Sequence, residues 1–511
     1  MGVAKNTLES LQWFTRFLDE TPGDDEEGGP PRRVPNVCWS RVNPTPPPSP
    51  KLELWSNEMA DELGIERPDG QILGGGEIVA GMDPYAQRYG GHQFGNWAGQ
   101  LGDGRAITLG EAQGKNGILE LQLKGAGLTP YSRFADGKAV LRSSIREFLC
   151  SEAMHHLGIP TTRALSLVST GESVIRDIMY DGNPKPEPGA VVCRVAPSFL
   201  RFGSFQIHTN SGDIPTLKDL VEHTIKHHFA NHLADDDEGR ISWLKHVAAQ
   251  TAKMISHWMR VGFVHGVMNT DNMSIHGLTI DYGPYGWIED FNPRWTPNTT
   301  DATTRRYQYG QQPQIGAWNV ARLLEAIGPL MDEKERLYEV LETYYDTFEQ
   351  ENKFMWVAKL GLSEYLESDE SLIGELIALL QEVETDMTIF FHKLYFVKSP
   401  NIESLEEAFY DPSSIPVEGW NKWLEKWWNR INASPNQEEM RKANPKYVLR
   451  NWMAQLAIDA AEKGDYSIAE ELHELLKNPY DEQSEYEDKW YQKRPEWARN
   501  RVGCSMLSCS S

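Results

Sequence analysis

Apolar and polar residues alternate in the first half of the chain in a pattern typical of β-strands. In Ile118–Lys124 three leucines occupy every second position, as expected for a strand with one buried face. Shorter apolar runs at Ala164–Val168 and Ala190–Val195 also predict strands. Leu141–Leu157 instead carries apolar residues at helical spacing. We therefore expect a mixed α/β lobe in this half.

Beyond residue 215 the spacing of apolar residues becomes that of amphipathic helices. Ile241–Arg260 has the strongest helical pattern and is followed by Gly262, a residue type that often ends helices. We expect further helices from Ala317 to about Gln381, and a helical tail rich in tryptophan. The whole pattern predicts an α+β, protein-kinase-like two-lobed fold, with a mixed α/β N-lobe and a mainly helical C-lobe.

Proline and glycine indicate where the parts of the chain begin and end. Residues 22–50 are rich in both, which excludes a helix there and predicts a linker or an extended arm. We predict four parts: an N-terminal segment with this Pro-rich linker (1–84), an N-lobe with a Gly-rich nucleotide loop (85–205), a C-lobe with the catalytic loop (206–400), and a Trp-rich helical extension with a cysteine-containing tail (401–511).

Composition narrows the choice of partners and compartment. The chain of 511 residues has 74 acidic and 50 basic residues, a net charge of −24, so neither nucleic acid nor an anionic membrane is an expected partner. Its five scattered cysteines do not form a disulfide framework, which favours a reducing compartment. We find no secretory or transit signal at the N-terminus and no apolar run of the ~18 residues needed to span a membrane. A cytoplasmic protein is expected.

A lysine and a glutamate stand where protein kinases carry a functional pair. Lys124 ends the alternating strand after a glycine-rich segment, and Glu147 lies on the next predicted helix. In kinases the strand lysine contacts nucleotide phosphates and pairs with a helix glutamate. Taken singly, each residue is more often a solvated surface charge. The order strand, lysine, helix, glutamate favours the kinase-like pair.

A second constellation follows the long predicted helix. His265 begins a loop in which Asn272 occupies the position of the metal-binding asparagine of a kinase, and Asp281-Tyr282-Gly283 takes the place of the D-F-G motif. Amide and carboxylate oxygens are hard donors suited to Mg²⁺ shared with ATP phosphates. A chance match in an unrelated loop is the alternative.

One position departs from the kinase pattern. The aspartate that receives the substrate proton in kinases is replaced here by Val267, which accepts no proton. Asp271, just before the predicted metal-binding asparagine, offers a carboxylate for the role of general base. Ordinary γ-phosphoryl transfer by the usual arrangement is therefore not favoured.

Three longer strings carry a family resemblance. Tyr89–Gly95, Leu123–Arg133 and His265–Ser274 resemble the selenoprotein O family, also called YdiU, and the resemblance runs from about Arg41 to Asn319. That family is described as pseudokinase-like proteins that bind ATP in a flipped orientation and transfer AMP to Ser, Thr or Tyr. The resemblance thus implies a protein adenylyltransferase with ATP as substrate, and it extends to UMP transfer with Mn²⁺ in bacterial members.

The resemblance also implies roles for individual residues. Asp271 would be the general base, and Asn272 and Asp281 would bind Mg²⁺ or Mn²⁺. The nucleotide would contact the following residues: Gly102, Gly104, Arg105, Lys124, Asp136, Gly137, Glu147, Arg194, Arg201 and Asp281. Without the family match, Arg194 and Arg201 would be read as ordinary surface arginines.

Two other readings of the function stay open at this point. One is an unconventional kinase that transfers the γ-phosphate, and the other is a catalytically silent ATP-binding scaffold. Asp271 speaks against the silent protein, because a scaffold has no need of a carboxylate beside the metal ligands. Eukaryotic members of the family are usually mitochondrial, but the N-terminus gives no support for that location.

The resemblance extends to the C-terminal tail. Family members carry a selenocysteine or a cysteine there, and Cys509 matches the cysteine form. In some bacterial relatives this cysteine is thought to bridge to one that follows the D-Y-G motif. The corresponding stretch here, Trp295–Thr299, contains no cysteine, so that bridge is not expected.

A histidine-rich stretch is a further metal candidate. His223, His227, His228 and His232 include a pair spaced for one helix face, which could bind a metal ion. The glutamate-containing pattern of zinc proteases is absent, and we favour a solvated helix face.

Overall fold

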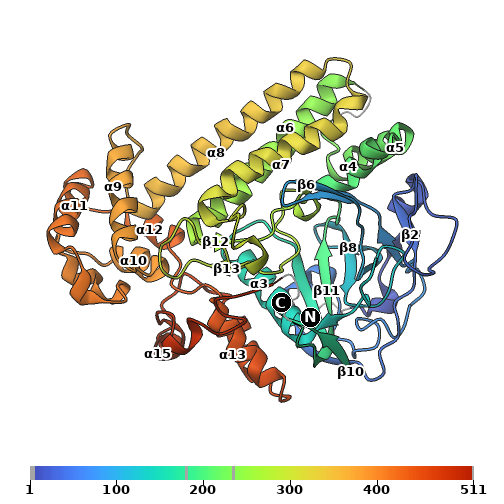
Figure 1. Ribbon diagram of the computed structural model, residues 1–511, viewed down its shortest axis with the longest axis horizontal. Helices are drawn as coiled ribbons and strands as arrows, with labels where there is room; N and C mark the ends of the chain where they lie inside the picture. Colours follow the sequence, from blue (N-terminus) through green and yellow to red (C-terminus); the bar gives the residue numbers. More distant parts are fainter. Residues whose placement is uncertain (1–5, 179–181, 233–235, 509–511) are drawn as a thin grey trace, which may run out of the picture.

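The computed structural model describes residues 6–178, 182–232 and 236–508. Strands gather in the part of the molecule formed by the first 200 residues, and helices dominate the rest (Figure 1). This confirms the predicted α+β class and its two lobes. The boundaries that we assign to the four parts stay a prediction.

The described residues of the first lobe form one nine-stranded sheet in which the paired strands run antiparallel. Its main order is β2-β4-β7-β8-β11-β10-β3, with β1 beside β7 and β9 beside β11. The strands are β1 (Trp13–Phe14), β2 (Trp39–Arg41), β3 (Lys51–Trp55), β4 (Tyr85–Gln87), β7 (Ala106–Gly114), β8 (Gly117–Lys124), β9 (Ala139–Val140), β10 (Arg163–Arg176) and β11 (Lys185–Ala196). The three predicted strands are thus confirmed within β8, β10 and β11.

Two small two-stranded ladders lie close to the segments that carry the predicted site residues. They pair β5 (Gly90–Gln93) with β6 (Asn96–Gln100), and β12 (Phe263–Val264) with β13 (Gly286–Trp287). The first ladder is formed by the glycine-rich segment, and the second holds the loop that carries the catalytic motifs.

The helices fall into three sets. Those of the first lobe and its junction with the second are α1 (Arg16–Glu20), α2 (Asn57–Leu63), α3 (Leu141–His156), α4 (Phe202–Ser211) and α5 (Ile214–His228). Three long helices follow, α6 (Asp237–Val261), α7 (Gln312–Ile327) and α8 (Leu337–Leu360). The remainder are α9 (Asp369–Glu382), α10 (Met387–Leu394), α11 (Val417–Arg430), α12 (Gln437–Ala443), α13 (Asn451–Ala461), α14 (Ser467–Leu475) and α15 (Ser484–Trp490).

The predicted helix ends are close to those observed. Gly262 caps α6 in the left-handed conformation, with φ of 76°. Helix α7 begins at Gln312, five residues before the predicted start, because Pro313 is tolerated in the first helical turn. None of the helices in the described ranges is long and apolar enough to cross a membrane.

The proline-rich stretch at 22–50 is an arm that packs on the sheet. Its strand β2 pairs with β4, and the Trp39 ring is buried with its Nε1 donating to the carbonyl of Thr21. The linker interpretation was therefore wrong for this part, and the extended arm was right. Proline blocks helix there, but buried apolar side chains still anchor the chain.

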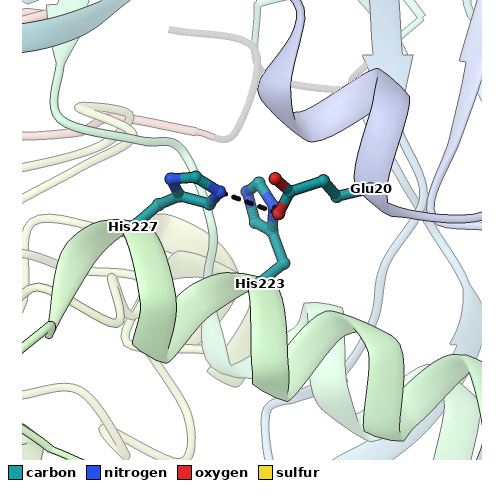
Figure 2. A group of neighbouring side chains, drawn as sticks. All are labelled: Glu20, His223 and His227. Atoms are coloured by element: carbon teal, nitrogen blue, oxygen red, sulfur yellow. Dashed lines mark hydrogen bonds and ion pairs between the residues drawn. The ribbon is translucent and has the colours of Figure 1, made fainter.

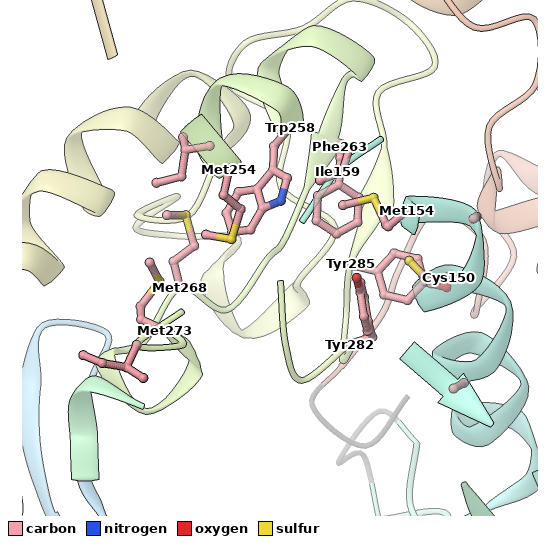
Figure 3. Close-up of a cluster of buried hydrophobic side chains, with 14 of the residues drawn as sticks. Cys150, Met154, Ile159, Met254, Trp258, Phe263, Met268, Met273, Tyr282 and Tyr285 are labelled. Carbon is pink, nitrogen blue, oxygen red and sulfur yellow. The ribbon is translucent and has the colours of Figure 1, made fainter. Parts of the chain in front are cut away.

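A hydrophobic core lies beneath the catalytic segments. Figure 3 shows side chains from α3, α6 and the D-Y-G region packed together, among them Met154, Trp258 and Tyr282. Tyr285 closes this core and donates through its hydroxyl to the carbonyl of Arg146 over 2.8 Å. Because these side chains are buried, the loop above them is held in a defined position.

The C-terminal extension packs on the rest of the protein. Trp420, Trp423 and Trp427 of α11 are buried in a core shared with α9 and α10. The last described residues reach the segment after the D-Y-G motif, where Thr299 N donates to the carbonyl of Leu507 over 2.8 Å. Cys509 lies outside the described residues; the four other cysteines are buried and free.

Candidate active site

A cavity of about 680 Å³ lies where the sheet meets the catalytic loop, and we call it the nucleotide cavity. Ten of the twelve residues predicted for the site line it: Gly102, Gly104, Arg105, Lys124, Asp136, Gly137, Arg194, Asp271, Asn272 and Asp281. The other two, Glu147 and Arg201, are buried and contact residues of this lining. Segments far apart in the sequence thus meet at one place.

The predicted lysine–glutamate pair is formed. Lys124, at the end of β8, has its Nζ 2.6 Å from Oε2 of Glu147 on α3. Arg194 of β11 donates to the other oxygen of the same carboxylate over 3.2 Å. Burial lowers the pKa of Lys124, while Glu147 opposes that effect and favours the charged amine. The pair therefore presents a desolvated cation to the cavity.

Asp281, the first residue of the D-Y-G motif, is surrounded by cations. Its Oδ1 lies 2.6 Å from Nη1 of Arg194, and its Oδ2 lies 2.5 Å from Nη1 of Arg201. The Nζ of Lys124 is 3.8 Å away. Burial opposes the charged form of this carboxyl, but the three cations hold its pKa well below the ordinary value. Asp281 is therefore ionised.

These contacts leave an excess of positive charge. Three cations, from Lys124, Arg194 and Arg201, face the two carboxylates of Glu147 and Asp281. The neighbouring Asp103 is buried, and burial raises the pKa of its carboxyl group, which favours the neutral acid. Such a cluster is suited to a polyanion that replaces some of the internal ion pairs.

Asp271 has the environment of a general base. Burial raises its pKa to about 6, although a hydrogen bond from Gln93 to its Oδ2 opposes the shift. Its Oδ1 is buried and has no hydrogen-bond partner among the described residues. A carboxylate with one unused oxygen and a pKa near neutrality can take a proton from a bound hydroxyl. Its position is set by Arg201, which donates to its backbone carbonyl over 2.8 Å.

The residues predicted to bind a metal ion fit a divalent cation. Asn272 donates its side-chain amide to the carbonyl of Val267 over 2.9 Å, which leaves its amide oxygen as a ligand. Asp281 lines the same cavity, and each of its oxygens keeps a lone pair beside the arginine contact. Amide and carboxylate oxygens are ligands that Mg²⁺ and Mn²⁺ accept. Val267 lines the cavity and offers no polar atom.

The glycine-rich segment has a packing role that the sequence did not reveal. A Cβ on Gly102 would lie 2.6 Å from the Tyr131 ring, and one on Gly104 would lie 2.9 Å from the Tyr131 carbonyl. Glycine is therefore needed at both positions for this wall of the cavity to form. Arg105 beside them makes no ion pair within the described ranges, so its guanidinium is available to an anion.

Asp136 lines the cavity but has a partner already. Arg176 of β10 pairs with its carboxylate at 2.7 Å, and Lys138 N donates to it over 3.0 Å. Arg176, Lys138 and Arg133 also line the cavity, and none of them was predicted. No sequence signal points to them, because they match no position of the kinase pattern.

The histidine-rich stretch of α5 makes an ion-pair cluster rather than a solvated face. Figure 2 shows His223 and His227 turned toward the carboxylate of Glu20 from α1, with distances of 3.3 and 2.7 Å to its Oε2. Lys226 pairs with the other oxygen at 2.7 Å. Since Lys226 and the two imidazole rings already satisfy this carboxylate, the cluster joins α1 to α5 without needing a metal ion.

Fold and site together define a protein of the kinase-like class. The sheet supplies the strand lysine, the next helix supplies its glutamate, and the loop after the long helix supplies the asparagine and the aspartate of the predicted metal site. The absence of the usual proton acceptor at Val267 separates it from ordinary kinases.

Comparison with known proteins identifies the family. The sequence profile described as "Protein adenylyltransferase SelO" matches residues 32–477, and the chain belongs to this family. A protein of Flavobacterium johnsoniae named "Protein nucleotidyltransferase YdiU" is 53% identical, over 99% of this chain and 100% of its own. The protein of the same name from Aromatoleum aromaticum is 52% identical over the same shares. The expected enzyme class, protein nucleotidyltransferase, is thereby confirmed.

Among solved structures, a match is ROP2 of Toxoplasma gondii, described as a virulence factor with a protein-kinase fold and no enzymatic activity. It is 13% identical, and the match covers 58% of this chain and 86% of that one. The TM-score is 0.22, so this likeness carries no argument about the present protein.

Proposed function

We propose that this protein transfers AMP from ATP to the hydroxyl group of Ser, Thr or Tyr residues in other proteins and releases pyrophosphate. The observation that supports it most is the arrangement at Asp281, where three cations converge on one carboxylate of the cavity that Asp271, with its unpaired carboxylate oxygen, also lines. The cations suit a polyphosphate, and the carboxylate suits a proton acceptor.

The cations would act on the triphosphate. Arg194 and Arg201 are buried and the Lys124 side chain is only 11% exposed, so their attraction for an anion is little screened by water. As the bond from the α-phosphorus to the bridging oxygen breaks, negative charge passes to the departing pyrophosphate. The same cations stabilise that charge without further rearrangement, because the carboxylates of Glu147 and Asp281 hold them in place.

Asp271 would activate the acceptor. Its free Oδ1 takes the proton of the acceptor hydroxyl while the hydroxyl oxygen forms a bond to the α-phosphorus. With a pKa of about 6 the carboxylate is ionised at pH 7 and basic enough to accept that proton. Asn272 and Asp281 would hold Mg²⁺ or Mn²⁺, which when bound neutralises phosphate charge.

Two alternatives make different demands on the site. A kinase of ordinary type needs a proton acceptor at the position of Val267, and valine offers none. A silent scaffold has no use for a buried, unpaired carboxylate, and burying one costs stability. UMP transfer from UTP with Mn²⁺ uses the same groups and is part of the proposal. The expected cytoplasmic location stays a prediction.

Intact-protein mass spectrometry of an acceptor mixture incubated with the enzyme, Mg²⁺ and ATP tests the proposal. We expect an AMP adduct that disappears in Asp271→Asn, and a UMP adduct when UTP and Mn²⁺ replace ATP and Mg²⁺. A phosphate adduct would make the protein a kinase. No adduct on any acceptor, nor on the enzyme itself, would favour the scaffold.

A further inference from the structure

A second cavity, of about 700 Å³, adjoins the nucleotide cavity. Tyr131, Arg133 and Phe134 line both of them, so a ligand in one reaches the edge of the other. The second cavity lies between the N-terminal arm, β6, the loop around residue 132 and the end of α4. None of the roles assigned to the active site uses it.

The charge of this cavity is opposite to that of the protein. Its lining includes four arginines and no aspartate or glutamate, in a chain with 74 acidic and 50 basic residues. We call it the arginine groove, after Arg32, Arg33, Arg88 and Arg133. A positive patch within a negative surface concentrates anionic ligands at that patch.

The four arginines differ in whether an acidic side chain already pairs with them. Arg32 is already paired with Asp24. Arg33 and Arg133 make no ion pair within residues 6–178, 182–232 and 236–508, so nothing there neutralises them. Arg88 is 5% exposed, and its Nε has no hydrogen-bond partner among these residues. A buried guanidinium nitrogen without a partner is costly, unless a ligand supplies the acceptor.

The walls of the arginine groove are fixed by hydrogen bonds between segments. Gln100 on β6 donates to the carbonyl of Arg32 over 2.8 Å and accepts from the backbone of Val34 over 3.0 Å. The backbone of Arg32 donates in turn to the carbonyl of Pro130 over 2.9 Å. The arm, β6 and the loop are thus joined, and the groove is formed before a ligand arrives.

Aromatic side chains complete the surface. The Phe134 side chain is fully exposed at the boundary of the two cavities, and the Trp97 ring is half-buried in the wall of the groove. Exposed phenylalanine is costly in water, and aromatic residues together with arginine are enriched at protein interfaces. This combination suits a polypeptide better than a small anion.

We propose that the arginine groove binds an acidic stretch of the acceptor polypeptide and thereby brings a neighbouring Ser, Thr or Tyr to the nucleotide cavity. This inference rests on the proposed function. Arg33 and Arg88 pair with carboxylates of the acceptor, and Phe134 contacts the chain where it crosses from one cavity to the other. The substrate class is proteins in which the modified hydroxyl lies next to acidic residues.

The test uses two fluorescent peptides of the same length, each with one serine and one tyrosine. One is rich in Glu and Asp, and its twin has Gln and Asn at those positions. Fluorescence anisotropy at low salt measures their binding to the full chain without nucleotide. We expect the acidic peptide to bind about tenfold more tightly than its twin, and Arg33→Glu to abolish that difference. Arg441→Glu, also at an exposed arginine but far from the groove in sequence, is the matched control and retains it.

AMP transfer to the same peptides gives the second readout. At subsaturating peptide, Arg33→Glu lowers the rate with the acidic peptide by about tenfold and leaves the rate with its twin unchanged. The proposal is overturned if both peptides bind with equal affinity, or if Arg33→Glu does not change the binding. The proposal is also overturned if the groove binds inorganic tripolyphosphate in a way that depends on Arg33 but does not bind the acidic peptide. If no peptide or protein receives AMP, the proposed function falls, whereas the anisotropy still reports on the groove.

Discussion

Gln93 Nε2 donates a hydrogen bond to Oδ2 of Asp271 over 3.1 Å, although 178 residues separate the two in the chain. The contact occupies one carboxylate oxygen, while the other, Oδ1, is buried and has no hydrogen-bond partner among the described residues. The glycine-rich segment therefore does more than form a wall of the cavity: it orients the carboxylate that we assign as general base.

Replacing Gln93 by Leu should change the pH dependence of transfer. The hydrogen bond lowers the pKa of Asp271, so its loss moves that pKa above the present value of about 6. Because the base acts when ionised, transfer rises with pH through this pKa, and the rise moves to higher pH in the variant. We expect a rate about three- to tenfold lower at pH 6 and a smaller difference at pH 8. The profile of kcat/KM against pH measures this.

The control for this variant is Gln113→Leu, at an exposed glutamine near the end of β7, which should keep the original profile. A pH profile that is lowered evenly in Gln93→Leu, with no shift along the pH axis, would contradict the orienting role.

Gly91→Ala tests the close approach of the same segment to the base. A Cβ at residue 91 would lie 2.3 Å from Oδ1 of Asp271, so the carboxylate must move. We expect transfer to fall by about 100-fold, since small displacements of a catalytic group have effects of that size. Gly374→Ala has nothing within 4 Å of the added atom and should transfer normally. Full activity of Gly91→Ala would show that Asp271 needs no fixed position.

Glu20→Gln tests the cluster between α1 and α5. Burial opposes the charged carboxylate, but Lys226, His227 and His223 lower its pKa to about 2. A lowered pKa stabilises the fold above the ordinary carboxyl value of about 4.5, and this stabilisation is lost as the pH falls from there toward 2. We expect Tm to fall by about 1–2 °C at pH 7, and the difference to shrink below pH 4.5.

The comparison for this change is Glu77→Gln, at an exposed glutamate without an ion pair among the described residues. Its Tm should match that of the unaltered protein at both pH values. A Glu20→Gln variant whose Tm falls by the same amount at pH 7 and at pH 2.5 would show that the ionised carboxylate is not what joins the two helices.

Some of the site could be predicted from the sequence because its signals are local. The alternating strand that ends in Lys124 and the helix that carries Glu147 are each visible in a short window, and their side chains meet at 2.6 Å. The long helix before the catalytic loop and its stop at Gly262 were equally clear. Hydrophobic periodicity and capping depend on residues only a few positions apart.

Other features depend on tertiary packing that no local pattern records. The pairing of Arg176 with Asp136 joins β10 to a loop 40 residues earlier. The arm at 22–50 looked like a linker because proline dominates it, but Trp39 buries enough apolar surface to anchor it on the sheet. Glu20 and the α5 histidines meet across about 200 residues, and their spacing alone gave no hint of a shared partner.

The central claim is that AMP, not phosphate, is transferred, and labelled ATP tests it most directly. Two reactions with Mg²⁺ use ATP labelled at the α-phosphate or at the γ-phosphate, each with the unaltered protein and with Asp281→Ala. We expect label on protein from the α-position alone, and its loss in Asp281→Ala, because that residue pairs with Arg194 and Arg201 and is a proposed metal ligand. Protein-bound label from the γ-position, or undiminished transfer by Asp281→Ala, would contradict the account.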